Sequence, residues 1–158
     1  MNELKPEAVM KALECCAVLQ DRPNRKRDVG GEMNAFTIQG TLPGLNEYVN
    51  ACRAAACKGA RMKKDADELI GWYIRMAIQR GDLKPPSRAV IVHFTWREKR
   101  GKRDVDNVAF AKKFILDALV KNKILTDDRR KFVKGFTDAF REAESDSILV
   151  ELEEIIGA

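Results

Sequence analysis

Two aspartates separated by one residue give the strongest chemical signal in this sequence. Asp104 and Asp106 stand near the end of the basic stretch 97–107, where a loop is predicted to enter a helix. Carboxylates spaced in this way can point into the same small volume, and oxygen ligands suit Mg²⁺ or Mn²⁺. Asp128 follows 22 residues after Asp106, and we expect it at the same edge if the next strand runs back beside the preceding one. The three acids predict a divalent-cation site.

A lysine beside such a site would supply positive charge to the transition state or to the leaving oxygen of a phosphodiester. Lys113 lies seven residues beyond Asp106, close to two helical turns, and therefore on roughly the same helix face. Lys112 is about 100° around the helix from it, so Lys113 is the chosen candidate. The structural alternative for Lys113 is an i,i+4 ion pair with Asp117.

Two basic clusters accompany the aspartates and predict contacts with phosphate groups. The first directly precedes the aspartate pair, with only Glu98 opposing it, and consists of Arg97, Lys99, Arg100, Lys102 and Arg103. The second lies on a predicted helix and contains Arg53, Lys58, Arg61, Lys63 and Lys64, of which we take the last three as DNA contacts. The alternatives are a solvated loop and a solvated helix face. Similarly, Asp106 can serve as a helix cap and Asp127-Asp128 as a turn.

Net charge agrees with a polyanionic partner. The 158 residues carry +5, and residues 142–158 hold six acids and no base, so removing them leaves +11 on residues 1–141. Nucleic acid is the first candidate partner and a membrane surface the second. No apolar run approaches the ~18 residues that span a bilayer, and the first residues lack the basic start of a signal peptide. We therefore expect a cytoplasmic protein without a membrane partner.

Few residue types remain for catalysis. The single histidine, His93, argues against Ser-His-Asp catalysis, a His-rich zinc site and a His-based nuclease. The four cysteines lack zinc-site spacing and are expected to be reduced thiols: Cys15, Cys16, Cys52 and Cys57. Any enzymatic chemistry must therefore use carboxylates, lysines and a hard metal ion.

The pattern along the chain predicts an N-terminal extension and linker over 1–32 and one compact domain over 33–158. Within the domain, alternating β-branched and aromatic residues predict strands over 36–42, 88–97, 131–140 and 147–155. Apolar residues at three- and four-residue steps predict helices over 46–79, capped by Asn46 and with a break near Gly59, and over 106–121. This order predicts an α+β fold, strand-helix-strand-helix-strand-strand, with the helices packed on one mixed β-sheet.

Several motifs occur in order along the domain: TLPGLNEY at 41–48, RDVDN at 103–107, KFILDAL at 113–119 and LTDDRR at 125–130. Together they resemble the RusA family of Holliday junction resolvases, over roughly residues 33–155. The resemblance implies a RusA-like domain, a homodimer, and an Mg²⁺-dependent endonuclease, with Mn²⁺ as a substitute ion. Such enzymes resolve four-way DNA junctions by paired symmetric nicks in DNA recombination and repair. They are often encoded by phages or prophages.

The resemblance also assigns roles to residues. It implies that the metal-binding acids are Asp104, Asp106 and Asp128, and that the catalytic lysine is Lys113. Asn107, which completes the DxDN motif, joins the predicted DNA contacts. In the better-known family pattern the lysine lies one helical turn after the second aspartate, where this sequence has Phe110. The stretch from Asp106 to Asp117 is about three residues longer here.

The leading hypothesis is an Mg²⁺-dependent, structure-selective DNA endonuclease, and two other classes of function stay open. A non-catalytic protein that binds branched DNA would share the basic surface and its steep salt dependence, but it would not need the metal. An Mg²⁺ enzyme acting on a nucleotide sugar can also use a DxD sequence, although no nucleotide-binding pattern surrounds it here. Dependence on Mg²⁺ and on the aspartates separates the nuclease from the DNA-binding protein.

Overall fold

The computed structural model describes residues 34–157, which belong to a compact unit spanning Met33–Ala158. The predicted extension and linker over 1–32, with its two cysteines, lies outside the described residues. In chain order the elements are β1 (Asn34–Gln39), α2 (Leu45–Ala54), α3 (Ala56–Arg80), β2 (Val90–Glu98), α4 (Val105–Ala109), α5 (Lys112–Lys121), β3 (Val133–Glu142) and β4 (Ser147–Glu154). The predicted order of strands and helices is confirmed, except that each predicted helix is divided into two.

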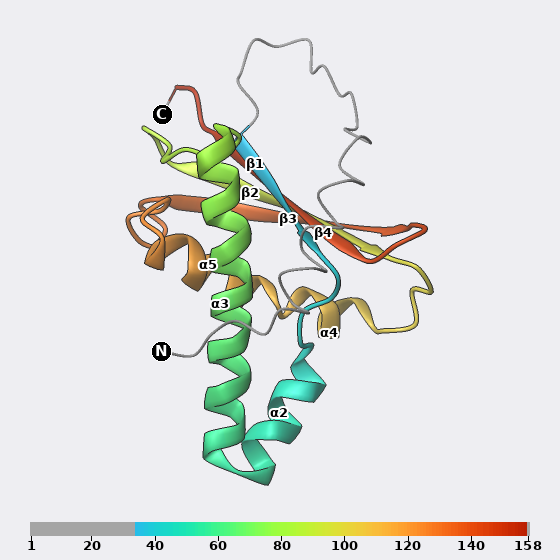
Figure 1. Ribbon diagram of the computed structural model, residues 1–158. Helices are drawn as coiled ribbons and strands as arrows, with labels where there is room; N and C mark the ends of the chain where they lie inside the picture. The colour runs from blue at the N-terminus through green and yellow to red at the C-terminus, as the bar shows by residue number, and fades with distance from the viewer. Residues whose placement is uncertain (1–33, 158) are drawn as a thin grey trace. The chain divides into compact units, whose positions relative to one another are not determined.

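The strands form one four-stranded mixed sheet in the order β1-β4-β2-β3 (Figure 1). β4 pairs antiparallel with β1 and β2, whereas β3 runs parallel to β2 at one edge. Parallel neighbours need a crossover connection, and the chain supplies it by running back beneath the sheet through α4 and α5. This crossover carries the predicted aspartates and lysine from the end of β2 to the start of β3.

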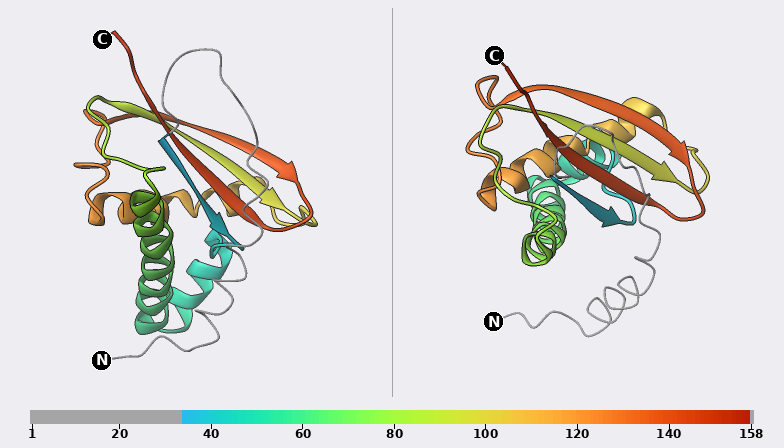
Figure 2. Two further views of the ribbon diagram at one scale, coloured as in Figure 1. Left: turned by 45° about the horizontal axis from the view of Figure 1, so that its top comes forward. Right: turned by 90° about the horizontal axis from the view of Figure 1, so that it is seen from above.

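The alternation along β2 decides which face of the sheet is buried. Val92, Phe94 and Trp96 are buried, while the side chains between them are only partly covered. The helices lie on one face of the sheet in both views of Figure 2. Ile70 and Ile74 of α3 are fully buried in the same core. The predicted α+β fold, with helices packed on one mixed sheet, is therefore confirmed.

His93 lies on the other side of β2 and links this strand to both of its neighbours. Its Nδ1 is 2.6 Å from Thr137 Oγ1 on β3, and its Nε2 is 2.6 Å from Glu153 Oε2 on β4. Both ring nitrogens therefore have partners, and the only histidine serves to tie three strands together.

The predicted helix over 46–79 is two helices, because Ala55 between them adopts an extended conformation with φ −168° and ψ 141°. The break lies at Ala55 and not near Gly59, so the predicted position is wrong. Gly59 has a packing role instead, since a Cβ at this position would collide with Cys52 Sγ on α2. Cys52 and Cys57 are both free thiols, as expected.

The predicted helix over 106–121 is also interrupted, at Phe110 and Ala111 between α4 and α5. The Phe110 ring packs against Tyr48 of α2 and Phe114 of α5, with ring centroids 5.6 Å apart in each pair. Phe110 and Ala111 keep right-handed helical dihedrals, but the hydrogen bonds here run three residues back, from Ala111 to Val108 and from Lys113 to Phe110. The regular period of 3.6 residues is therefore interrupted between Asp106 and Lys113.

The remaining element boundaries differ little from the predicted ones. The first strand ends at Gln39, so that Thr41 and Leu42 belong to the loop before α2. β2 and β3 each begin two residues later than predicted, and β4 begins at Ser147 as predicted. No helix in the described part of the chain is long and apolar enough to cross a membrane.

Candidate functional site

The two aspartates of the DxDN motif lie where the chain leaves β2 and enters α4. Asp104 is the last extended residue before the helix, with φ −60° and ψ 143°, and Asp106 belongs to the first helical turn. Asp106 is therefore not the helix cap. Both side chains are exposed, and neither carboxylate makes a hydrogen bond or ion pair with any residue in 34–157. Two carboxylates one residue apart are thus available to an external ligand.

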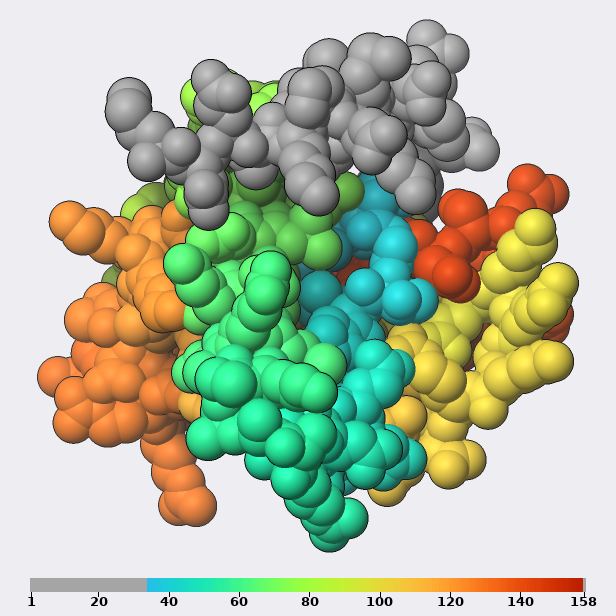
Figure 3. Space-filling view, turned by 60° about the horizontal axis from the view of Figure 1, so that its bottom comes forward, coloured from blue at the N-terminus to red at the C-terminus, as the bar shows by residue number. Residues whose placement is uncertain are grey.

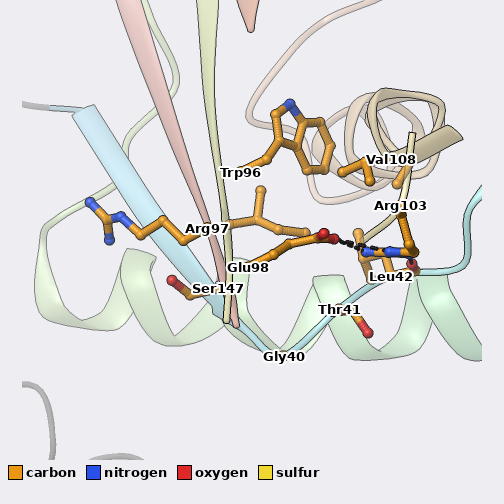
Figure 4. A pocket seen from close by; sticks show the side chains of 11 residues that line it. Gly40, Thr41, Leu42, Trp96, Arg97, Glu98, Arg103, Val108 and Ser147 are labelled. Atoms are coloured by element: carbon orange, nitrogen blue, oxygen red, sulfur yellow. Dashed lines mark hydrogen bonds and ion pairs between the residues drawn. The ribbon is translucent and has the colours of Figure 1, made fainter. Parts of the chain in front are cut away.

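Arg103, directly before the aspartates, holds this loop against the rest of the domain. Its Nε donates to Glu98 Oε1 at 3.0 Å, its Nη2 bonds to the same oxygen, and its Nη1 donates to the carbonyl oxygen of Leu42 at 3.1 Å (Figure 4). These groups lie along a small pocket that is also lined by Trp96 and Val108. Arg103 was predicted to contact DNA; its guanidinium here binds Glu98 and the Leu42 carbonyl oxygen, and the DNA contact stays a prediction.

Asn107, at the end of the motif, caps a helix far away in the sequence. Its Oδ1 accepts a hydrogen bond from the backbone N–H of Asn46, at 2.9 Å, near the start of α2. The residue at the N-cap of α2, Gly44, has no side chain to do this, and the predicted cap by Asn46 is wrong. The Asn107 amide oxygen thus stabilises α2, and the predicted contact of this residue with DNA stays a prediction.

A glycine makes this capping geometry possible. A Cβ at Gly44 would lie 2.6 Å from Asn107 Oδ1 and 2.9 Å from Asn107 Cγ, which is closer than real Cβ contacts. The 41–48 and 103–107 motifs, which are far apart in the sequence, therefore lie in direct contact through Gly44, Asn46 and Leu42.

We expect Gly44→Ala to destabilise the domain and to weaken whatever activity the aspartate loop performs. The new methyl group forces Asn107 away from α2, at a cost of about 1–3 kcal/mol from overpacking and a lost cap. Thermal unfolding measures this as a lower Tm. Gly135→Ala is the matched control, because Gly135 has no atom within 4 Å of an added Cβ and its φ is not positive. Equal Tm values for the two variants would contradict this role for Gly44.

The basic residues predicted to line the site fall into separate groups. Lys99, Arg100 and Lys102 are exposed at the tip of the loop and make no side-chain ion pair with the described residues. Arg97 points to the opposite side of β2 from Glu98 and Arg103, as the alternation of a strand requires (Figure 4). Arg97 therefore lies apart from the other basic residues of this loop.

The second basic cluster lies on α3, apart from Arg53 at the end of α2, and its members also differ. Arg61 and Lys64 are exposed, and Lys64 has only a loose ion pair with Glu68 at 3.9 Å. Lys63 instead reaches α5, where its Nζ lies 3.2 Å from Asp117 Oδ2. Figure 3 shows α2 and the beginning of α3 on one face, between the loop after β2 in yellow and the segment from α5 onwards in orange.

Lys113, in the first turn of α5, lies between two acids. Its Nζ is 2.9 Å from Asp117 Oδ1 and 4.0 Å from Asp128 Oδ2. The i,i+4 ion pair named as the structural alternative is therefore present, and the lysine is also close to the third predicted acid. In the turn after α5, Asp127 accepts hydrogen bonds from the Asp128 backbone and from Arg129. Asp127 is thus the turn-forming residue, and the Asp128 carboxylate faces Lys113.

Lys112, the neighbouring lysine, points to the sheet. Its Nζ lies 2.5 Å from Asp138 Oδ2 on β3 and over the rings of Phe94 and Phe136, 5.8 and 5.6 Å from their centroids. Trp96 Nε1 donates to the other oxygen of Asp138 at 2.9 Å. Lys112 therefore joins α5 to the edge strand, while Lys113 stays beside Asp117 and Asp128.

The charges around Lys113 shift two pKa values in opposite directions. The hydrogen bond to Asp117 raises the pKa of Lys113, and the charges of Asp117 and Asp128 add to this against a smaller effect of burial. Burial raises the pKa of Asp117, but hydrogen bonds and charge from Lys113 and Lys63 outweigh it and leave the pKa below the ordinary value. Both groups are therefore charged at neutral pH, and Lys113 can act as a cation or proton donor.

This pKa shift predicts a pH-dependent contribution of Asp117 to stability. A carboxylate whose pKa is lower in the folded state stabilises the fold above the unfolded pKa, and the contribution is lost as the pH falls through the folded pKa. We expect Asp117→Asn to cost about 1 kcal/mol at pH 7. The difference between the two proteins, measured by urea unfolding, should shrink below about pH 4. A difference that is constant from pH 7 to pH 3 would contradict the assignment.

The fit of the site to a divalent cation has a chemical and a geometric part. Asp104, Asp106 and Asp128 supply exposed carboxylate oxygens, the donor type that Mg²⁺ takes. Within residues 34–157, however, no three side chains of the Asp, Glu, His or Cys type gather closely enough to hold a metal ion. The aspartates are thus chemically suited to Mg²⁺ without forming a closed metal-binding group.

Comparison of the sequence with protein-family models and with curated proteins gave no match.

Proposed function

We propose that this chain is an Mg²⁺-dependent, structure-selective DNA endonuclease of the RusA type, which acts on four-way junctions. The observation that carries the proposal is that Asp104 and Asp106, on a loop held by Arg103 and Asn107, have no partner among residues 34–157. Fixed acids next to free lysines and arginines are what a cation-assisted attack on a phosphodiester requires. The 41–48 and 103–107 motifs, on which the resemblance to the RusA family rests in part, lie in contact through Leu42 and Asn46.

Each residue of the site has a proposed role. Asp104 and Asp106 would hold Mg²⁺, with Asp128 as the third ligand that the RusA resemblance implies and that would have to approach them on binding. Mg²⁺ would supply a water of lowered pKa and stabilise negative charge on the phosphoryl oxygens. Lys113, kept as an ammonium by its acidic neighbours, would donate a hydrogen bond or a proton to the scissile phosphate or its leaving oxygen. Lys112 is not assigned to the chemistry, because Asp138 and two aromatic rings engage it.

The exposed basic residues would bind the DNA backbone. We assign phosphate contacts to Lys99, Arg100 and Lys102 in the loop and to Arg61 and Lys64 on α3, since these side chains are exposed. A homodimer would present two such surfaces related by a two-fold axis, which matches a substrate with two-fold symmetry. Paired symmetric nicks would follow from one active site on each of two opposing strands.

The decisive experiment incubates the purified full chain with a labelled four-way junction, a matched linear duplex and a single strand, each with and without Mg²⁺. Denaturing gels resolve the products. Paired, symmetric nicks on the junction that require Mg²⁺ would establish the reaction and the substrate. A retarded junction on a native gel without any cleavage would overturn the nuclease proposal and favour a branched-DNA-binding protein.

A further inference from the structure

A group of four charged residues includes the lysine to which we assign the chemistry. Lys63 of α3 and Lys113 of α5 each contact one oxygen of Asp117, at 3.2 and 2.9 Å. Lys113 in turn lies 4.0 Å from Asp128. The four residues come from two helices and the segment that follows α5, so tertiary packing brings them together.

Asp117 is the most buried residue of this group. Its side chain is 17% exposed, whereas those of Lys63, Lys113 and Asp128 are 42, 56 and 41% exposed. An exposed i,i+4 ion pair alone is weak and leaves a long lysine side chain mobile. The second lysine occupies the other oxygen of Asp117 and so restricts the carboxylate itself.

We propose, on the basis of the proposed nuclease function, that Asp117 and Lys63 are positioning residues that hold the Lys113 ammonium beside Asp128. Lys63 acts from α3 through Asp117, and its role is to orient Lys113 and not to bind a phosphate. This revises the sequence-based prediction that Lys63 contacts DNA. Asp117 itself touches neither substrate nor metal in this arrangement.

Kinetics on the four-way junction separate positioning from DNA binding. We expect Asp117→Asn to lower kcat about 10–100-fold with a KM within about 3-fold of wild type, because orientation and not affinity is lost. Lys63→Met should lower kcat in the same sense, and Lys63→Arg should restore most of it by keeping the ion pair. A Lys63→Met variant that raises KM and flattens the salt dependence, at unchanged kcat, would show that Lys63 binds a phosphate and would overturn its positioning role.

Amine footprinting tests the same proposal without any reliance on cleavage. Acetic anhydride acylates the unprotonated amine of exposed lysines, so a lysine held as an ammonium in an ion pair is labelled slowly, and mass spectrometry of proteolytic fragments reports each site. We expect Lys113 to be labelled about 3–10-fold faster in Asp117→Asn and in Lys63→Met than in the wild type. Lys134, an exposed residue of β3 without an ion pair to the described residues, serves as the internal control for unfolding.

Junction cleavage and lysine labelling distinguish failure of the nuclease proposal from failure of the positioning proposal. If the wild type cuts no DNA with Mg²⁺ but footprinting changes as expected, the nuclease proposal fails and the positioning of Lys113 stands. If the wild type cuts and Lys113 labelling is the same in all variants, the positioning proposal is overturned and the nuclease proposal stands. Asp65→Asn, which removes one exposed acid from α3, should change neither labelling nor kcat.

Discussion

Replacing Asp106 by Asn should reduce Mg²⁺-dependent junction cleavage by about 10³-fold, equivalent to about 4 kcal/mol of transition-state stabilisation. The substitution removes one charged oxygen ligand while keeping size and shape. Junction binding should stay the same or become tighter, because the variant has one negative charge fewer beside the phosphates. Single-turnover cleavage and native gel shifts with the same labelled junction measure the two effects.

The structure predicts that this variant folds normally. Asp106 is exposed and has no partner among residues 34–157, so its loss costs at most a few tenths of a kcal/mol of helix-terminus interaction. Asp65→Asn makes the same change of charge on α3 and should cut at the wild-type rate. Wild-type cleavage by Asp106→Asn would show that the DxDN motif is not the active site.

The two adjacent lysines should give opposite results when each is replaced by Met. Lys113→Met should lower kcat by about 10²–10⁴-fold, because it removes the proposed proton donor. It should lower Tm only slightly, since Lys63 keeps its ion pair with Asp117. Lys112→Met should keep cleavage within about 3-fold of wild type. It should lower the stability by about 1 kcal/mol, since the ion pair with Asp138 and the contacts with two rings are lost.

Cleavage assays and thermal unfolding of the two variants side by side check this contrast. The pair is internally matched, because both substitutions remove the same charge from consecutive residues of α5. If Lys112→Met loses cleavage and Lys113→Met does not, the proton donor has been assigned to the wrong lysine, and the group around Asp117 has only a structural role.

The strands could be predicted well because their signals are local. The alternation of Val90, Val92, Phe94 and Trp96 identifies both the strand and its buried face within one short window. The breaks in the helices could not be predicted so well. The helical spacing of apolar residues continues across Ala55, so it does not reveal the break there. Gly59 suggests a break in the sequence, but the structure shows that it is needed for close packing against Cys52.

The site could be predicted by residue type but not by role. The sequence shows that Asp104, Asp106 and Asp128 are acids in a basic setting, but it does not show which neighbours are already engaged. Arg103 reaches the carbonyl oxygen of Leu42, 61 positions away, and Asn107 is equally far from Asn46. Contacts between residues so far apart cannot be recognised from a short stretch of sequence. The sequence therefore does not reveal that Arg103 and Asn107 hold the loop in place.

The cap that Asn107 provides for α2 also has a consequence for synthesis on the ribosome. α2 buries no residue completely and has no capping side chain of its own, so it is a weak helix in isolation. Its cap is made 61 residues after the amide that needs it. At about 5–20 residues per second, the nascent chain carries α2 uncapped for roughly 3–12 s. During that interval the apolar side chains of α2 and α3 are exposed to chaperones, and the helix pair becomes complete only when the aspartate loop has emerged.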